Sequence, residues 1–237
     1  MHRILLFPLL LLPVLISSSF RLPPYSIDRI AASIVTRQVQ KGKSITLKGD
    51  VYYQRNGNMV THFTYPVEYI VIANRLGETK VYDPLKNTVM QYQNFLFSTQ
   101  SSQFYYFLSG KISDMGLLSI GYVQDKTYNE NGLLVTEWKL KTPSKKALIQ
   151  RIKIVYDGER PVYMHYQDGA GKVFRKVYYY NYQPLDTYTF PATTTEIIYE
   201  KGDSTVSRTN YTDFKLNTMA PGAWFNYTIP ANAATVQ

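Results

Sequence analysis

The chain has 237 residues and no cysteine, and its 26 lysines and arginines outnumber its 17 acidic residues for a formal net charge of +9. Without cysteine it can form no disulfide, thiolate zinc site or thiol nucleophile, and it cannot itself be a lipoprotein acylated on an N-terminal cysteine. The length fits one domain, and the 22 tyrosines favour strands over helices. A basic surface suits an anionic membrane or an acidic protein partner, or serves solubility alone.

The first 19 residues have the layout of a secretory signal peptide. A short basic start precedes the apolar run Ile4–Ile16, and three serines end at Ser19, where we expect cleavage. The competing interpretation is a membrane anchor, but the run is shorter than the roughly 20 residues needed to span and contains Pro8 and Pro13. We therefore expect residues 1–19 to be removed and residues 20–237 to form one soluble exported domain. Because we expect the chain to be exported, we expect no nucleic-acid partner to account for its positive charge.

Apolar residues then recur at helical spacing from Ile27 to Val39. Ser26 is a suitable N-cap and Gly42 a suitable stop. The pattern predicts an amphipathic N-terminal helix whose apolar stripe lies on another element.

A run of short strands follows, with the hairpin signal Asn56-Gly57-Asn58 after the first of them. Pro66 cannot donate to a ladder, so it marks an edge, a bulge or a strand break. The predicted strands are Ser44–Arg55, Val60–Tyr65, Val67–Ala73, Glu78–Tyr82 and Asn87–Gln93.

The pattern changes at Phe95–Leu108, which is rich in aromatics and poor in charge. Ser98 can cap a helix there and Gly110 can end it, and Ser113–Leu118 predicts a further helical turn. So aromatic a segment is either the plug of a core or a lid over a cavity.

The second half alternates again, with turn residues such as Asp157-Gly158 between the runs. This predicts an antiparallel sheet that curls into a barrel or sandwich, with the tail after Asn217 wrapped around the outside. The predicted strands are Ser119–Lys126, Leu133–Lys141, Leu148–Asp157, Pro161–Gln167, Lys172–Tyr182, Pro191–Lys201 and Ser204–Leu216.

No catalytic or cofactor motif is found. His62 and His165 lie in different predicted strands without metal-ligand spacing, and no nucleophile elbow or phosphate loop occurs. Glu68 and Glu196 could form an acid/base pair, but carboxylates on separate strands are common and their spacing carries no information. We therefore expect no enzyme activity, no metal and no cofactor.

Two features remain. The predicted sheet has an apolar face of its own, and two further apolar segments, Ile27–Val39 and Phe95–Leu118, are available to cover it. These segments either pack a closed core or line a cavity for lipid chains. A basic loop is either a solvated hairpin tip or a docking patch. The candidate docking residues are Lys141, Lys145, Lys146 and Arg151.

The order of elements resembles the bacterial outer-membrane lipoprotein carrier family, the LolA-type proteins. The resemblance rests on the N-terminal segment ending near Val35–Val39, on short motifs from Val60 to Pro84, and on Thr189-Phe190-Pro191 with the strand ending at Phe214–Asn217. It implies a half-open, strongly curved antiparallel barrel, covered by an N-terminal helix and a central helical lid. Tyr65 stands where better-known members have an arginine that contacts the lid.

The resemblance also implies a monomeric carrier that acts in the periplasm without a cofactor. Such carriers take a lipoprotein from an inner-membrane transporter, shield its acyl chains and pass it to an outer-membrane acceptor. The alternative is an envelope lipid-sensing or scaffold module of the same fold, which binds an amphiphile without transporting it. Candidate cavity and lid residues are Phe63, Tyr65, Tyr69, Val71, Val81, Phe97, Phe104, Phe107, Leu108, Leu118, Trp138, Ile152 and Ile154.

Overall fold

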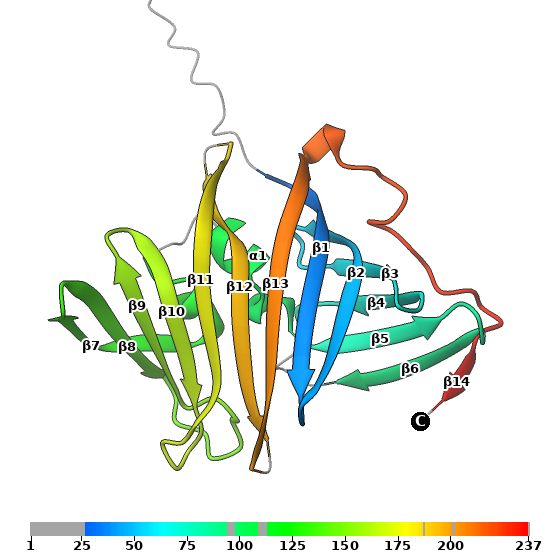
Figure 1. Ribbon diagram of the computed structural model, residues 1–237. Coiled ribbons are helices and arrows are strands. Elements are labelled where there is room, and N and C mark those ends of the chain that lie inside the picture. Colours follow the sequence, from blue (N-terminus) through cyan, green and yellow to red (C-terminus); the bar gives the residue numbers. More distant parts are fainter. Residues whose placement is uncertain (1–26, 94–97, 109–112, 187, 201, 237) are drawn as a thin grey trace, which may run out of the picture.

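The computed structural model describes residues 27–93, 98–108, 113–186, 188–200 and 202–236. Fourteen strands of these ranges form one sheet in the spatial order β14-β6-β5-β4-β3-β2-β1-β13-β12-β11-β10-β9-β8-β7 (Figure 1). Neighbouring strands are antiparallel except β14, which pairs parallel to β6. The signal peptide expected over residues 1–19 lies outside the described residues.

The strands are β1 (Arg29–Gln40), β2 (Lys43–Gln54), β3 (Met59–Tyr65), β4 (Tyr69–Ala73), β5 (Glu78–Asp83), β6 (Thr88–Gln93), β7 (Tyr122–Glu130), β8 (Leu133–Leu140), β9 (Arg151–Asp157), β10 (Arg160–Gln167), β11 (Val173–Leu185), β12 (Tyr188–Glu200), β13 (Asp203–Leu216) and β14 (Ala234–Val236). The helices are η2 (Thr99–Ser101), α1 (Gln103–Leu108), η3 (Leu117–Ile120) and η4 (Asn217–Met219).

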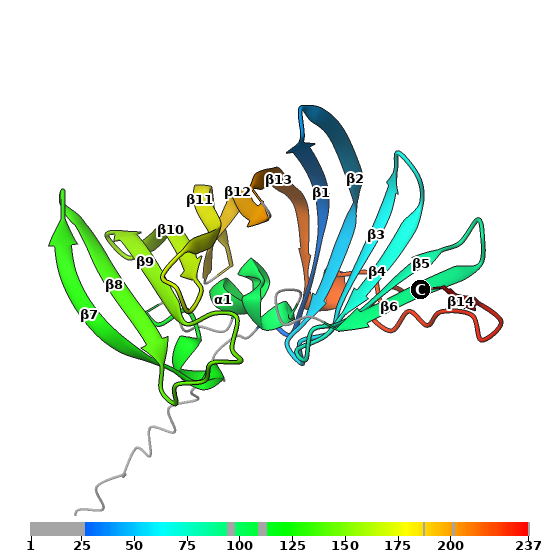
Figure 2. The same cartoon turned by 90° about the horizontal axis from the view of Figure 1, so that it is seen from below.

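The sheet is strongly curved but does not close, since β7 lies at one end of the strand order and β14 at the other. Figure 2 shows two wings of strands with α1 between them. We call the side that carries α1 the concave face and the opposite side the convex face. The expected mainly β, half-open and strongly curved architecture is confirmed at this level, whereas its helical cover is not.

The predicted N-terminal helix is wrong, because residues 29–40 form strand β1 between β2 and β13. The sheet has a larger hydrophobic cluster on its concave face, which we call the main core, and a smaller one on its convex face. Ile30 and Ile34 belong to the main core, while Ala31 packs into the convex cluster. A strand buried on both faces loses its simple alternation and can imitate helical spacing. The β-branched residues of this segment favour the strand.

The aromatic segment is less helical than expected. Its residues 95–97, Phe97 included, lie outside the described part, and the rest forms only the short elements η2 and α1. Phe104, Phe107 and Leu108 are buried in the main core, so α1 packs as a plug on the concave face. The second helical turn, η3, begins at Leu117 and ends at Ile120.

The C-terminal tail covers the convex face of β2–β6, as the sequence predicts for a segment on the outside (Figures 1 and 2). Phe225 is buried there against Tyr52, and Trp224 stacks on His62 with ring centroids 4.1 Å apart. The tail thus gives this wing a second, smaller hydrophobic core.

The other strands lie near their predicted positions, with differences at some of their ends. Strand β7, for example, begins only at Tyr122, because Ser119 and Ile120 belong to η3, and β11 and β12 extend to Leu185 and Tyr188.

Pro66 stands between the end of β3 and the start of β4, so it marks a strand break. The β2–β3 ladder shifts register between Lys48 and Gly49. A Cβ atom at Gly49 would lie 2.0 Å from the carbonyl oxygen of His62, so only glycine fits this close approach.

Candidate functional site

Two adjacent cavities lie on the concave face, where η2 and α1 meet the sheet. Their volumes are about 220 Å³ and 330 Å³, and we call them the first and the second cavity. Both are lined by Met59, Ser101, Ser102, Arg175 and Glu196, so these residues stand between them. Together the cavities fall within the range of about 300–1,000 Å³ that is typical of small-molecule sites.

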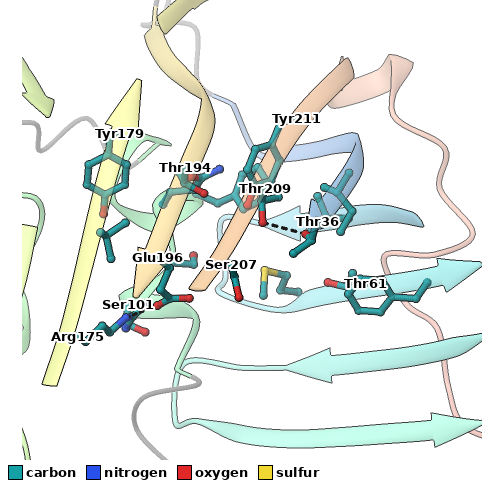
Figure 3. A pocket seen from close by; sticks show the side chains of 18 residues that line it. Thr36, Thr61, Ser101, Arg175, Tyr179, Thr194, Glu196, Ser207, Thr209 and Tyr211 are labelled. Carbon is teal, nitrogen blue, oxygen red and sulfur yellow. Dashed lines mark hydrogen bonds and ion pairs between the residues drawn. The ribbon is translucent and has the colours of Figure 1, made fainter. Parts of the chain in front are cut away.

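The two cavities differ in their walls. The second cavity is bounded mainly by apolar side chains from both wings of the sheet: Met59, Val71, Ala73, Tyr92, Phe174 and Ile198. The first cavity is lined both by apolar side chains and by hydroxyl groups. Among the latter, the Thr36 hydroxyl of β1 lies 2.9 Å from the Thr209 hydroxyl of β13 (Figure 3). The apolar lining includes Ile34, Val51, Phe63 and Phe104. The site thus combines an apolar chamber with a polar one.

An ion pair between Arg175 of β11 and Glu196 of β12 borders both cavities (Figure 3). The guanidinium Nε donates to Glu196 Oε1, and the guanidinium carbon lies 4.9 Å from the centre of the Tyr166 ring. Burial opposes the charge of Arg175, but the Glu196 carboxylate and nearby tyrosine oxygens hold its pKa above the ordinary value. Arg175 is therefore a charged group fixed in one orientation.

Two nitrogen atoms at the first cavity are buried and have no hydrogen-bond acceptor among the described residues. They are Arg175 Nη1 and Gln103 Nε2. Gln103 is only 8% exposed and comes from α1, whereas Arg175 comes from the sheet. Buried donors are normally satisfied, so these two are unusual.

The tyrosines around Arg175 stay neutral. Tyr106 and Tyr166 share a hydrogen bond of 3.2 Å between their hydroxyl oxygens, and burial raises the pKa of both phenols and of Tyr179. The surroundings of the ion pair are thus polar without adding charge.

The structure separates the candidate cavity residues into three groups. Phe63, Val71 and Phe104 line the two cavities. The buried core, away from the lining, contains Phe107, Leu108, Trp138, Ile152 and Ile154. Tyr65 and Leu118 are 52% and 61% exposed and line neither cavity, and Tyr69 and Val81 are half-buried outside the lining.

The candidate docking residues lie at the connection from β8 to β9. Lys141, Lys145 and Lys146 are exposed on it. Arg151, at the start of β9, forms an ion pair of 2.9 Å with Asp125 of β7, which also binds Lys139. Hydrogen bonds from Lys139 and Arg151 lower the pKa of Asp125. Part of the predicted patch is therefore neutralised within the sheet.

Glu196 and Glu68 do not meet. Glu196 binds Arg175 on the concave face, whereas Glu68 binds His62 at 2.8 Å in the convex cluster. His165 lies on the convex face of β10 beside Tyr163, with its Nδ1 3.1 Å from the phenolic oxygen. Within the described ranges, no three acidic or histidine side chains come together as a metal site.

Sequence reasoning missed Arg175, Gln103 and most of the hydroxyl groups. Arg175 stands in a strand whose neighbours Lys172 and Lys176 are also basic, so nothing distinguishes it from a solvent-facing charge. The one usable signal is that Arg175 and Glu196 lie on consecutive predicted strands, at positions that a hairpin can bring opposite each other.

The fold has known counterparts, although neither a protein-family model nor a curated protein sequence matches the chain. Among solved structures, a DUF1329 family protein from Desulfovibrio piger is similar with a TM-score of 0.60 at 14% identity, over 85% of this chain and 90% of that one. A putative outer membrane lipoprotein-sorting protein domain from Vibrio parahaemolyticus has a TM-score of 0.57 at 16% identity, over 84% and 89%.

A LolA superfamily protein from Nitrosomonas europaea also has a TM-score of 0.57, at 13% identity over 83% of this chain and 89% of that one. At such identities the likeness concerns the fold alone. No helix in the described ranges is long and apolar enough to cross a bilayer. The chain therefore has a LolA-like fold: one open, strongly curved sheet around a central plug.

Proposed function

We propose that the protein binds the acyl chains of a lipoprotein, or of a similar lipid, in the two concave cavities. In this proposal it is a periplasmic carrier that moves its cargo from the inner to the outer membrane without catalysis. The observation that carries the proposal is the pair of cavities between α1 and the sheet, one of them walled mainly by apolar side chains. Apolar walls with a few polar groups suit a lipid chain.

The LolA-like fold supports the same proposal, because the structure from Vibrio parahaemolyticus is described as a lipoprotein-sorting domain. A carrier also needs partners that load and unload it. We propose an inner-membrane transporter and an outer-membrane acceptor for these roles, with the exposed Lys145 and Lys146 as the docking surface.

Native mass spectrometry of the protein purified from its own envelope fraction tests the binding. We expect a copurified lipid or lipoprotein that is lost on denaturation. A hydrophobic fluorescent probe should also bind and be displaced by a diacylated peptide. A protein that purifies empty and binds neither probe nor peptide would contradict the proposal.

A transfer assay separates a carrier from a lipid-sensing module. The loaded protein is mixed with acceptor vesicles, and the acylated peptide that reaches them is measured. A carrier releases its cargo to the vesicles, whereas a sensing module retains it. Lys145→Glu with Lys146→Glu should slow transfer to the native acceptor membrane while leaving probe binding unchanged.

A further inference from the structure

The convex face of the central strands carries a row of cationic side chains. In β1 and β13, Thr36 and Thr209 line the first cavity on the concave face, so the adjacent Arg37 and Arg208 lie on the convex face. The same alternation along β11 and the pairing of β1 with β2 place two lysines on this face as well. We call these four residues the convex basic surface: Lys48, Arg37, Arg208 and Lys176.

No carboxylate in the described ranges forms an ion pair with any of these four residues. The convex positions of β1, β11, β12 and β13 over residues 33–39, 176–180, 193–199 and 206–210 hold no aspartate or glutamate. Glu196 of β12 lies on the concave face instead. Asp50 of β2 borders the surface, where it accepts a hydrogen bond of 2.7 Å from Ser33. The surface therefore keeps its positive charge.

Tyrosine rings lie beneath three of the four cations. A ring attracts a cation to its face and restricts its position without cancelling its charge. The cation-to-ring distances are 5.5 Å for Lys48 over Tyr65, 5.3 Å for Lys176 over Tyr199 and 5.6 Å for Arg208 over Tyr180.

The two arginines of the surface are placed unfavourably for folding alone. Arg37 and Arg208 stand directly opposite each other in the β1–β13 ladder, and both are exposed. Like charges in this arrangement destabilise a strand pair. A negatively charged partner would offset the repulsion, so the arginine pair indicates that the surface binds one.

The position and composition of the surface favour a lipid bilayer as this partner. Strands β13 and β1 lie in the middle of the strand order, where the arched sheet passes over α1 (Figure 2). On the same face, Val35 and Val39 are exposed on either side of Arg37, and Tyr178 is exposed on β11. Tyrosine is enriched at the headgroup level of membranes, and anionic headgroups attract lysine and arginine. A bilayer also presents mobile charges that adapt to a row of cations without a shaped groove.

We propose that the convex basic surface docks the protein onto an anionic lipid bilayer, with phospholipid phosphates beside Arg37 and Arg208. The inference goes beyond the proposed function, because it concerns the opposite face of the sheet. In the docked protein the two concave cavities face away from the bilayer and stay accessible to a cargo.

Cosedimentation with phosphatidylcholine vesicles, with and without phosphatidylglycerol, tests the proposal on the protein purified from its own envelope fraction. We expect binding only where phosphatidylglycerol is present, and weaker binding as sodium chloride screens the charges. Each cation near an anionic surface raises the partition coefficient roughly fivefold. Arg37→Gln combined with Arg208→Gln should therefore lower it roughly 25-fold.

Two further variants assign the effect to charge at this surface. Arg37→Lys combined with Arg208→Lys keeps both charges and should keep the binding. Arg160→Gln is the matched control, because Arg160 is exposed and lies over a tyrosine ring, that of Tyr182, at 5.7 Å, but outside the convex basic surface. It should bind the vesicles like the original protein. The double glutamine variant should melt at or above the temperature of the original protein, since the like-charge repulsion is gone.

Four outcomes would overturn the inference. The first is no binding to phosphatidylglycerol vesicles, and the second is equal binding by the double glutamine variant. The third is a clear fall in the melting temperature of that variant, which would make the arginine pair a stabilising feature of the fold. The fourth is tight binding of soluble polygalacturonate by a protein that ignores the vesicles, which would assign the surface to an acidic polysaccharide.

Fluorescent-probe binding separates this inference from the proposed function. The double glutamine variant should bind the hydrophobic probe like the original protein, because neither arginine lines a concave cavity. A protein that docks on vesicles but binds no probe contradicts the proposed function alone. A protein that binds the probe but no vesicle contradicts this inference alone.

Discussion

The two faces of the sheet both carry aromatic clusters, yet they are completed differently. On the convex face the C-terminal tail packs against the sheet: Trp224 stacks on His62 and Tyr227, and Gln54 donates to the carbonyl of Phe225. A cavity of about 580 Å³ remains between the tail and β3–β5.

On the concave face α1 fills only part of the space. The first and second cavities remain there, and among the described residues that line them Arg175 Nη1, Gln103 Nε2 and Thr79 Oγ1 have no hydrogen-bond partner. Both faces thus retain cavities, and the concave face differs from the convex face in the unpartnered buried donors among its described lining residues.

Matched truncations of one phenylalanine on each face should give the largest effects. Phe104 and Phe225 are 3% and 4% exposed, so Phe104→Ala and Phe225→Ala should each lower the free energy of unfolding by about 3–5 kcal/mol. Chemical denaturation measures this loss. Only Phe104→Ala should also change probe affinity, because Phe104 lines the first cavity.

Equal changes in probe affinity for the two variants would remove the functional distinction between the faces. Thermal melts recorded alongside show whether each variant is folded at the temperature of the binding assay.

Gly49→Ala changes the pairing of β2 with β3, two strands whose side chains contribute to both faces of the sheet. The new Cβ atom would collide with the backbone of His62 and Phe63, so β2 and β3 must separate at the bulge. We expect a loss of about 1–3 kcal/mol in the free energy of unfolding. Because Phe63 lines the first cavity, probe affinity should fall as well.

Gly222→Ala is the matched control for that substitution. Its Cβ atom would meet nothing within 4 Å, so stability and binding should stay close to those of the original protein. A Gly49→Ala protein as stable as the control would contradict the close approach of β2 and β3.

The last prediction concerns pH and the convex face. Burial lowers the pKa of His165 to about 4, with smaller contributions from Lys153 and Lys176, against an opposing one from Glu137. The unfolded chain binds a proton near pH 6.5 and the folded protein does not, so stability falls as the pH drops from about 6.5 to about 4. In His165→Gln, the melting temperature should fall less over this range.

Probe binding by His165→Gln should match the original protein at neutral pH, since His165 lies away from the cavities. An unchanged pH dependence of the melting temperature would show that His165 titrates in the folded state near its ordinary pKa.

The sheet could be predicted from the sequence because alternation and turn residues are local signals. Asn131 and Gly132, for example, both have positive φ in the turn between β7 and β8. Strand β1 could not, since Ala31 and Ile30 are buried on opposite faces and the resulting pattern resembles a helix. Which partner covers each face is a property of the whole fold.

The candidate site was predictable only in its apolar part. Phe63, Val71 and Phe104 follow from hydrophobic patterning, but five other candidates with the same character are ordinary core residues. Arg175 and Glu196 are 21 positions apart, and their pairing depends on the register of β11 and β12. Neither that register nor the position of Gln103 at the first cavity is encoded in any short motif.

An open sheet has a consequence for how the molecules behave at high concentration. A terminal strand exposes backbone groups that can recruit a second chain and start a growing fibre. At one end the terminal strand is β14, which pairs with β6 over Thr88–Met90 and is only three residues long, so it offers few backbone groups to a second chain. At the other end β7 is irregular at Gln124–Lys126 and bears Asp125, Lys126 and Glu130, features that discourage strand addition. Both rims thus offer little backbone for pairing with another copy, while the concave face stays open to a guest.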